Sequence, residues 1–305
     1  MAKQRRTLTG RVVAITGAAR GIGRATAAAL VREGAQVAIG DLDAGLARRT
    51  AEELGPGATA FALDVTDRAS FEQFAGAVEA KLGPIDVLVN NAGIMPLGSF
   101  VAEDDITARR MVDINVHGVL HGMKVALPRL LARGDGHLVN IASAAGKGPY
   151  PGGATYCGTK HFVVGVSDAV RGELRGTGVE ISVVMPVVVD TELASGVGTP
   201  RGVPKIKPDD VAAAIVEVLG RPRFDVYVPR SIGPLTALAA VVPRRIREAA
   251  LRAIGADRVL WRVDAAARRE YELRAAHSEP ALEPAGGLGA DQNQPLSGAF
   301  DRSTS

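Results

Sequence analysis

Short apolar runs alternate with longer helical patterns along most of this 305-residue chain. Segments with 3.6-residue periodicity, among them 22–32, 71–82 and 155–174, separate the apolar runs. The runs that we predict as buried strands are 12–15, 37–39, 59–63, 85–89, 138–141, 181–184 and 226–228. Strands that alternate with helices indicate a parallel sheet with helices on both faces. We therefore predict an α/β fold, a doubly wound seven-stranded parallel sheet.

A glycine-rich loop joins the first predicted strand to the first predicted helix. It has the sequence TGAARGIG and spans residues 16–23. Gly17, Gly21 and Gly23 let the backbone turn tightly and approach a pyrophosphate, while the helix N-terminus beginning near Ile22 attracts its negative charge. A glycine cluster alone is weak evidence, but its place between a strand and a helix predicts a dinucleotide site.

Asp41 ends the second predicted strand, about 20 residues beyond the glycines, where a carboxylate accepts the ribose hydroxyls of NAD. It would also repel the 2′-phosphate of NADP, since two anions at that distance oppose each other. Two alternatives stay open. Asp41 can instead start a turn or cap the helix that begins near Gly45, and Arg20 in the glycine loop can attract a 2′-phosphate. The sequence favours NAD over NADP.

Further cofactor contacts are predicted at the ends of the next two strands. Asp64 and the adjoining Val65 follow the third strand, where Asp64 is placed to meet the adenine edge. Asn91, Ala92 and Gly93 follow the fourth strand and suit both loop stabilisation and a ribose contact. Ligands of open α/β sheets gather at these carboxyl ends of the strands.

Ser143 follows the fifth predicted strand, and Tyr156 and Lys160 lie four residues apart on the helix that comes next. Positions four apart share a helix face. A free tyrosine has a pKa of about 10 and is a poor base, and a neighbouring ammonium lowers that pKa. Tyr156 would then exchange a proton with an alcohol or ketone, and Ser143 would hydrogen-bond the same oxygen.

Together these motifs resemble those of the classical short-chain dehydrogenases/reductases over about residues 10–230. The resemblance rests on TGxxxGxG at 16–23, NNAG at 90–93 and YxxxK at 156–160. It implies a Rossmann-type fold, a nicotinamide cofactor, and a homodimer or homotetramer. It also implies that Asn115 is a fourth catalytic residue, whose main-chain carbonyl holds a water linked to Lys160.

The resemblance assigns the nicotinamide end of the site as well. It implies that Lys160 binds the nicotinamide ribose, that Thr191 meets the carboxamide, and that Val189 contacts it through the backbone. One position departs from the family pattern, because Val187 follows Pro186 where the family usually has glycine. The added side chain is expected to narrow the space beside the nicotinamide or to shift the loop.

The composition changes after the last predicted strand. We expect residues 1–233 to form the dinucleotide-binding catalytic domain, 234–277 a basic amphipathic helical extension, and 278–305 a disordered tail rich in Gly, Pro, Ala, Ser and Gln. Three roles stay open for the extension: a lid or packing helix over the substrate cleft, a dimer contact, or an interfacial membrane anchor through residues 235–254.

Charge and cysteine content exclude several classes of protein. A net charge of +3 gives no reason to expect nucleic acid as a partner. The single cysteine, Cys157, permits no internal disulfide, and the basic N-terminus has no apolar secretory region. We expect a cytoplasmic protein, with peripheral membrane attachment as the alternative. No metal is expected, because His117 and His121 share a helix face without a third ligand.

The function most favoured by the sequence is NAD-dependent interconversion of a lipophilic secondary alcohol and a ketone. A catalytically silent nucleotide-binding protein and a membrane-surface protein on the same fold are the alternatives. The intact set of Ser143, Tyr156 and Lys160 argues against a silent protein, which would have no chemical need for all three.

Overall fold

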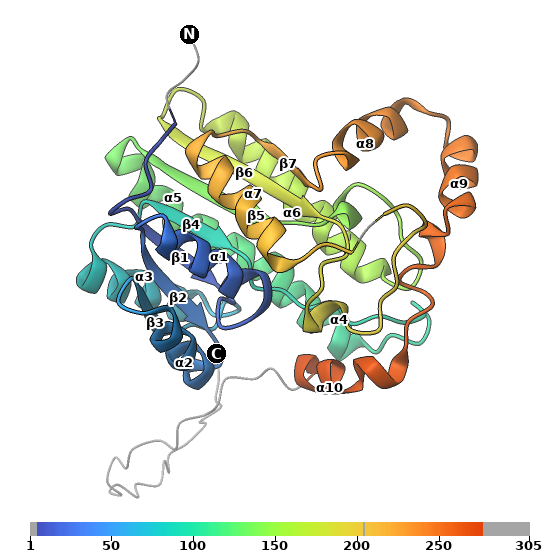
Figure 1. Ribbon diagram of the computed structural model, residues 1–305, viewed down its shortest axis with the longest axis horizontal. Helices are drawn as coiled ribbons and strands as arrows, with labels where there is room; N and C mark the ends of the chain where they lie inside the picture. The colour runs from blue at the N-terminus through green and yellow to red at the C-terminus, as the bar shows by residue number, and fades with distance from the viewer. Residues whose placement is uncertain (1–4, 204, 277–305) are drawn as a thin grey trace, which may run out of the picture.

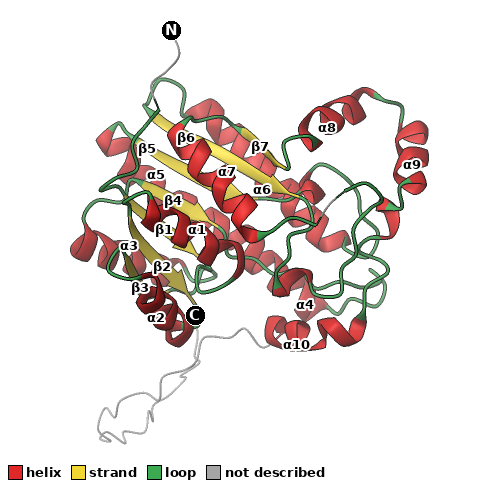
Figure 2. Ribbon diagram, in the orientation of Figure 1, coloured by secondary structure: helices red, strands yellow, loops and turns green. Residues whose placement is uncertain are grey.

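A computed structural model describes residues 5–203 and 205–276 and contains one seven-stranded parallel sheet (Figures 1 and 2). The strands are β1 Val12–Thr16, β2 Gln36–Asp41, β3 Ala58–Ala62, β4 Val87–Asn90, β5 Gly136–Ile141, β6 Val179–Pro186 and β7 Asp225–Val228. Their order in the sheet is β3-β2-β1-β4-β5-β6-β7, with every neighbouring pair parallel. The predicted doubly wound α/β fold is confirmed.

Strand β4 begins two residues later than predicted, directly after Asp86. The Oδ2 atom of Asp86 accepts a hydrogen bond from the Val12 backbone at 2.8 Å, and its Oδ1 atom meets Arg11 and Arg133 at 2.8 and 2.5 Å. The Asp86 backbone also donates to the Val12 carbonyl at 2.9 Å and accepts the His137 N–H at 3.0 Å. Asp86 therefore anchors this end of the sheet, and the residue pairing of β4 with β1 starts at Val87.

Helices cover both faces of the sheet (Figure 1). They are α1 Gly21–Arg32, α2 Ala44–Leu54, α3 Arg68–Leu82, α4 Asp105–Val112, α5 Gly118–Arg133, α6 Ala154–Glu173 and α7 Pro208–Gly220. The predicted helices over 22–32, 71–82 and 155–174 correspond to α1, α3 and α6. Helix α3 starts earlier than its apolar periodicity indicated, because Asp67 caps it by accepting the backbone N–H groups of Ala69 and Ser70.

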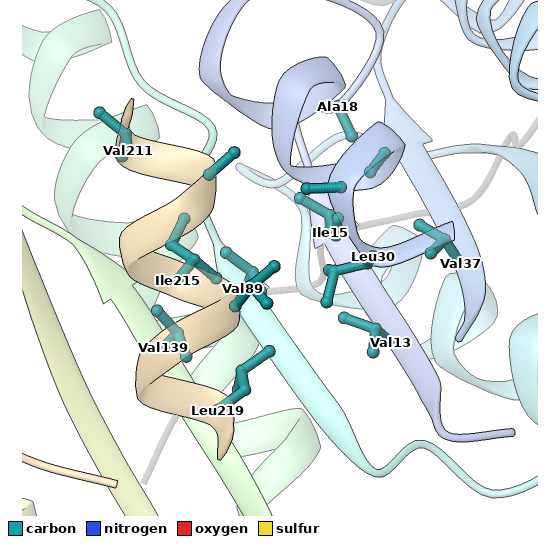
Figure 3. Close-up of a cluster of buried hydrophobic side chains, with 14 of the residues drawn as sticks. Val13, Ile15, Ala18, Leu30, Val37, Val89, Val139, Val211, Ile215 and Leu219 are labelled. Carbon is teal, nitrogen blue, oxygen red and sulfur yellow. The ribbon is translucent and has the colours of Figure 1, made fainter. Parts of the chain in front are cut away.

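Two apolar layers result from the alternation of side chains along each strand. On one face, Val13 and Ile15 of β1 pack with Leu30 of α1 and Ile215 of α7, a cluster drawn in Figure 3. On the other face, α3, α5 and α6 cover the sheet. Both faces of the strands are therefore buried, as is usual for parallel sheets, and the strand ends are left for binding.

Three further helices follow β7: α8 Ile232–Val241, α9 Arg244–Ala253 and α10 Ala265–Ala276. Neither α8 nor α9 contains a buried residue, whereas α10 buries Arg268 and Ala275. In Figure 1, α8 and α9 lie at the edge of the molecule, outside the layers that cover the sheet. The described part of the predicted extension, residues 234–276, thus contains helices that differ in burial. The disordered tail predicted over 278–305 lies outside the described residues.

Candidate active site

A cavity of about 1410 Å³ opens at the carboxyl ends of the strands. It is lined by nearly all residues that were predicted as site residues, from the glycine loop, the ends of β2 to β6 and the start of α6. The two exceptions are Gly23 and Asn115, which lie behind its wall. The predicted cofactor residues and the predicted catalytic residues therefore share one continuous space.

Two glycines of the glycine loop, Gly17 and Gly23, are packed too closely for a side chain. A Cβ atom on Gly17, whose φ is +63°, would lie 2.8 Å from the Cα atom of Ala92, and one on Gly23 would lie 2.5 Å from the Gly17 carbonyl oxygen. The N-cap residue of α1, Arg20, makes no side-chain hydrogen bond to the first turn. Gly21 lines the cavity at this helix end, so the loop fits a pyrophosphate.

Asn91 holds the loop after β4 against the loop after β1. Its Nδ2 atom donates to the carbonyl oxygens of Thr16 and Gly17 at 2.9 and 3.0 Å, while its backbone N–H and that of Ala92 donate to the Thr16 hydroxyl, each at 3.0 Å. The side chain therefore serves loop stabilisation, the first of the two roles expected for it. The neighbouring Gly93 gives Asn115 room, because a Cβ atom there would lie 3.1 Å from its Oδ1 atom.

Asp41 is buried at the end of β2 and borders the cavity. Its two oxygens accept the backbone N–H groups of Ala19 and Asp43, at 3.0 and 3.1 Å. Burial raises the pKa of Asp41, and these two hydrogen bonds partly offset that rise. The alternative that Asp41 caps helix α2 is wrong, because Asp43 is the cap and accepts the Leu46 N–H at 2.9 Å. Asp41 does start the turn, and its carboxylate is held rigidly.

Arg20 lies between two carboxylates at the cavity edge. Its guanidinium is 3.3 Å from Asp43 and 3.5 Å from Glu192, and the side chain is exposed to solvent. Glu192 belongs to the short helix Glu192–Ala194, which follows β6. Arg20 therefore connects the glycine loop to the loop after β6, and its charge is shared between acidic partners.

The remaining predicted cofactor residues line the cavity at its two ends. Next to β3, the Asp64 carboxylate accepts the backbone N–H and hydroxyl of Thr66 at 2.8 and 2.7 Å, and Val65 is buried beside it. Beyond β6, Val189 bridges to Ile206, and the Thr191 N–H donates to the Val189 carbonyl at 2.9 Å. Each end of the cavity is thus held by local hydrogen bonds.

Val187, the departure from the family pattern, also lines the cavity. Its side chain is partly buried against the core cluster between the sheet and α1, and its N–H donates to the Val228 carbonyl at 3.0 Å. The backbone thus continues regularly from β6 at Val187. The Val187 side chain contacts the core cluster and also lines the cavity.

Tyr156 and Lys160 are buried on the first turns of α6, and both face the cavity. The Lys160 Nζ atom lies 5.7 Å from the centre of the Tyr156 ring and donates to the Ile141 carbonyl at 3.0 Å. Ser143 follows β5 and accepts the Ala145 N–H at 3.1 Å. These hydrogen bonds hold Lys160 and Ser143 in place beside Tyr156.

Burial is the main cause of the pKa shifts of Tyr156 and Lys160. It raises the pKa of Tyr156, an effect that a hydrogen bond with the Ser143 side chain partly offsets. This direction is opposite to the one expected from a nearby ammonium, since the phenolate would lose its hydration in the cavity wall. Burial also lowers the pKa of Lys160 to about 8. At neutral pH the phenol is therefore protonated, and burial brings the pKa of Lys160 closer to neutrality.

Asn115 lies in the π-helical segment Asp113–His117 and is fully buried. Its side chain exchanges two hydrogen bonds with the backbone of Ile94, both 2.9 Å long, and donates to the Thr159 hydroxyl at 3.2 Å. Asn115 therefore ties the loop after β4 to the helix that carries Tyr156 and Lys160. A role of its main-chain carbonyl in a proton relay stays a prediction.

Two residues of α10 that were not predicted from sequence support the cavity: Tyr271 lines it, and Arg268 binds the backbone of Met95 and Leu193, which line it. Arg268 is fully buried and donates to three backbone carbonyls, those of Leu193, Ser195 and Met95, at 3.1, 2.9 and 2.6 Å. The Tyr271 hydroxyl accepts the Met95 N–H at 2.7 Å, and burial raises its pKa to about 12. Tyr271 lines the cavity and raises the pKa of Tyr156 electrostatically.

Comparison with known proteins identifies the family. Residues 11–201 match the model of the short chain dehydrogenases. The chain belongs to the short-chain dehydrogenase/reductase family. It is 41% identical to sorbitol dehydrogenase of Cereibacter sphaeroides over 191 residues, which cover 62% of this chain and 75% of that protein. It is 37% identical over 226 residues to 1-deoxy-11-beta-hydroxypentalenate dehydrogenase of Streptomyces exfoliatus, covering 71% and 82% of the two chains.

Solved structures of the short-chain dehydrogenase/reductase family agree with the fold. A member from Burkholderia phymatum in complex with NAD superimposes with a TM-score of 0.71 at 27% identity, covering 77% of this chain and 94% of that one. The chain spans only 18% of the length of another relative, glycine betaine reductase ATRR of Emericella nidulans, to which it is 36% identical over 227 residues, or 70% of this chain. Family membership makes the protein an oxidoreductase with a nicotinamide cofactor.

Within residues 5–203 and 205–276, no cluster of three or more His, Cys, Asp or Glu side chains is arranged to hold a metal ion. The rings of His117 and His121 lie 6.3 Å apart, and the His121 Nδ1 atom is 3.0 Å from the Val65 carbonyl oxygen. No helix in the described part of the chain is long and apolar enough to cross a membrane.

Proposed function

We propose that this family member interconverts a secondary alcohol and a ketone, with Tyr156 as the general acid and base. The observation that carries the proposal is the meeting of Tyr156, Lys160 and Ser143 in the cavity that also contains the glycine loop. When bound, the nicotinamide supplies or accepts the hydride at the substrate carbon. The protein residues must then orient the substrate oxygen and move its proton.

Proton transfer in the reducing direction needs a protonated donor. The raised pKa of Tyr156 keeps its hydroxyl protonated at neutral pH, ready to donate to the ketone oxygen. Ser143 donates a second hydrogen bond to that oxygen as its charge develops. In the oxidising direction the same groups act in reverse, and the Lys160 ammonium supports the phenolate that accepts the proton. Asn115 keeps α6 in register with the loop after β4.

We propose NAD as the preferred cofactor. The Asp41 carboxylate is fixed at the end of β2 by two backbone N–H groups. It would accept the ribose hydroxyls and oppose a 2′-phosphate. Asp64 and Val65 would hold the adenine, Lys160 the nicotinamide ribose, and Val189 and Thr191 the carboxamide. The proposal also includes a catalytic domain over 1–233, the extension over 234–277, a homodimer or homotetramer, and a cytoplasmic location.

The substrate is proposed to be lipophilic. Beyond Tyr156 the cavity wall is formed mainly by apolar side chains from the loops after β4 and β6 and from the C-terminal extension. These are Ile94, Met95, Val188, Leu193, Val197, Val259 and Leu260. The Tyr271 hydroxyl receives the Met95 N–H and retains its own proton, so it offers a hydrogen bond to a second polar group of the substrate.

The test follows nicotinamide absorbance with NAD and NADP across secondary alcohols, steroids, retinoids and acyl ketones. Tyr156→Phe should abolish turnover while leaving NADH binding intact. Tyr227→Phe is the matched control, because Tyr227 lies on β7 and does not line the cavity. Tight NADH binding without turnover of any substrate would instead support a catalytically silent nucleotide-binding protein.

A further inference from the structure

Helices α8 and α9 present apolar side chains to solvent. Leu235, Leu238 and Val241 of α8 are 61%, 60% and 79% exposed, and Ile246 of α9 is 61% exposed. Pro243 joins the two helices, and the Arg247 guanidinium donates to the Ala239 carbonyl at 3.5 Å. We call these four apolar side chains the α8–α9 surface. Exposed apolar side chains that form a patch mark a binding surface, whereas single scattered ones do not.

Charge around the α8–α9 surface is strongly basic. Residues 230–253 contain one acidic side chain, Glu248. The basic side chains of α9 are Arg244, Arg245, Arg247 and Arg252, whereas Arg230 before α8 pairs with Glu217. Arg244 and Arg252 share Glu248 at 2.6 and 4.0 Å, which leaves a clear positive excess. An apolar helix followed directly by an arginine-rich helix is complementary to an anionic lipid headgroup layer above acyl chains.

The same charge argues against a second copy of this chain as the occupant. A twofold contact through the α8–α9 surface would place the arginines of one copy against those of the other. Helix α8 has 10 residues and is about 15 Å long, half of what a bilayer core requires. It therefore fits in the plane of a membrane interface and not across it.

Both helices also border the substrate cavity. Leu235, Thr236 and Ala239 of α8, Leu251 of α9 and the adjacent Ile254 line it, and Leu235 contributes to the α8–α9 surface as well. The cavity that contains Tyr156 is thus lined in part by the two helices that carry the α8–α9 surface.

We propose that the α8–α9 surface binds the interface of an anionic membrane and admits a membrane-dissolved substrate to the cavity. The choice of substrate rests on the proposed function, whereas membrane binding does not. Binding can therefore be measured without turnover, and the two proposals can fail separately.

The experiment is co-flotation of the full chain with vesicles of phosphatidylcholine, with and without phosphatidylglycerol. We expect flotation with the anionic vesicles and at least tenfold weaker binding to phosphatidylcholine alone. The double variant Leu238→Ser/Val241→Ser should weaken anionic binding at least tenfold, because both side chains belong to the surface and neither lines the cavity. NADH binding should stay unchanged, which confirms folding.

Leu131→Ser is the control, since Leu131 is an exposed apolar residue of α5, a helix that covers the sheet and contributes no residue to the α8–α9 surface. It should float like the unchanged chain. Absence of flotation, or equal flotation of the double variant, would overturn the proposal. So would an oligomer in sedimentation that the double variant dissociates without any vesicle binding, because that result identifies a second copy as the occupant.

Discussion

Replacing Arg268 by methionine tests the role of the C-terminal extension most sharply. The side chain is fully buried, and its guanidinium joins the loop after β4 at Met95 to the loop after β6 at Leu193 and Ser195. Methionine keeps much of the volume but removes every donor. The three carbonyls then lose their partner in a buried site.

The magnitude follows from these contacts. A buried acceptor that loses its donor costs about 1 to 3 kcal/mol, and Arg268 donates to three carbonyls. The contact with Glu272, which is 41% exposed, adds little. We expect Arg268→Met to lower the free energy of unfolding by about 3 to 5 kcal/mol, the lower part of that sum, because the two loops relax partly.

Urea unfolding and steady-state kinetics measure the result. Substrate KM should rise at least tenfold, because both loops form the substrate wall, while the Kd for NADH should change less than about twofold. Arg269→Met is the control, since this neighbouring arginine is exposed. If Arg268→Met matches Arg269→Met in stability and KM, the reasoning about the buried guanidinium is refuted.

Two further predictions concern the cofactor end and the buried lysine. Asp41→Asn should lower the preference for NADH over NADPH at least about tenfold in Kd, and an equal change for both cofactors would argue against the ribose contact. The pKa of Lys160 is about 8 in the folded protein, below its ordinary value of 10.5. Between pH 8 and pH 10.5 the lysine is therefore protonated in the unfolded chain and mostly deprotonated in the folded one. Relative to Lys160→Met, the stability of the unchanged chain should therefore rise by about 3 kcal/mol from about pH 7 to about pH 11 in urea titrations, whereas a constant difference would contradict the buried charge.

The parts of the fold that local sequence determines were predictable. Continuous apolar strands and periodic helices fixed the order of elements, and the glycine loop followed from the backbone approach that Gly17 and Gly23 permit. Boundaries were harder where a side chain from elsewhere intervenes. Asp86 stands at such a boundary before β4, and its side-chain partners, Arg11 and Arg133, lie far away in the sequence.

Site residues that belong to a sequence motif could be predicted. Site residues that reach the cavity only through tertiary contacts could not. Arg268 and Tyr271 lie three residues apart on one face of α10. From sequence, however, an arginine in an Ala- and Arg-rich segment is predicted to be exposed to solvent. Only the fold brings both beside Met95. The pKa of Tyr156 is set by burial, a property of the packed cavity that the YxxxK spacing does not contain.

Transfer of deuterium from NADH labelled at C4 to a lipophilic ketone tests the central claim most directly. The account predicts deuterium on the carbinol carbon of the product, detected by mass spectrometry, and its loss in Tyr156→Phe with NADH still bound. Full transfer by Tyr156→Phe, or no labelled alcohol from any ketone despite tight NADH binding, would contradict the assignment of Tyr156 and of the reaction.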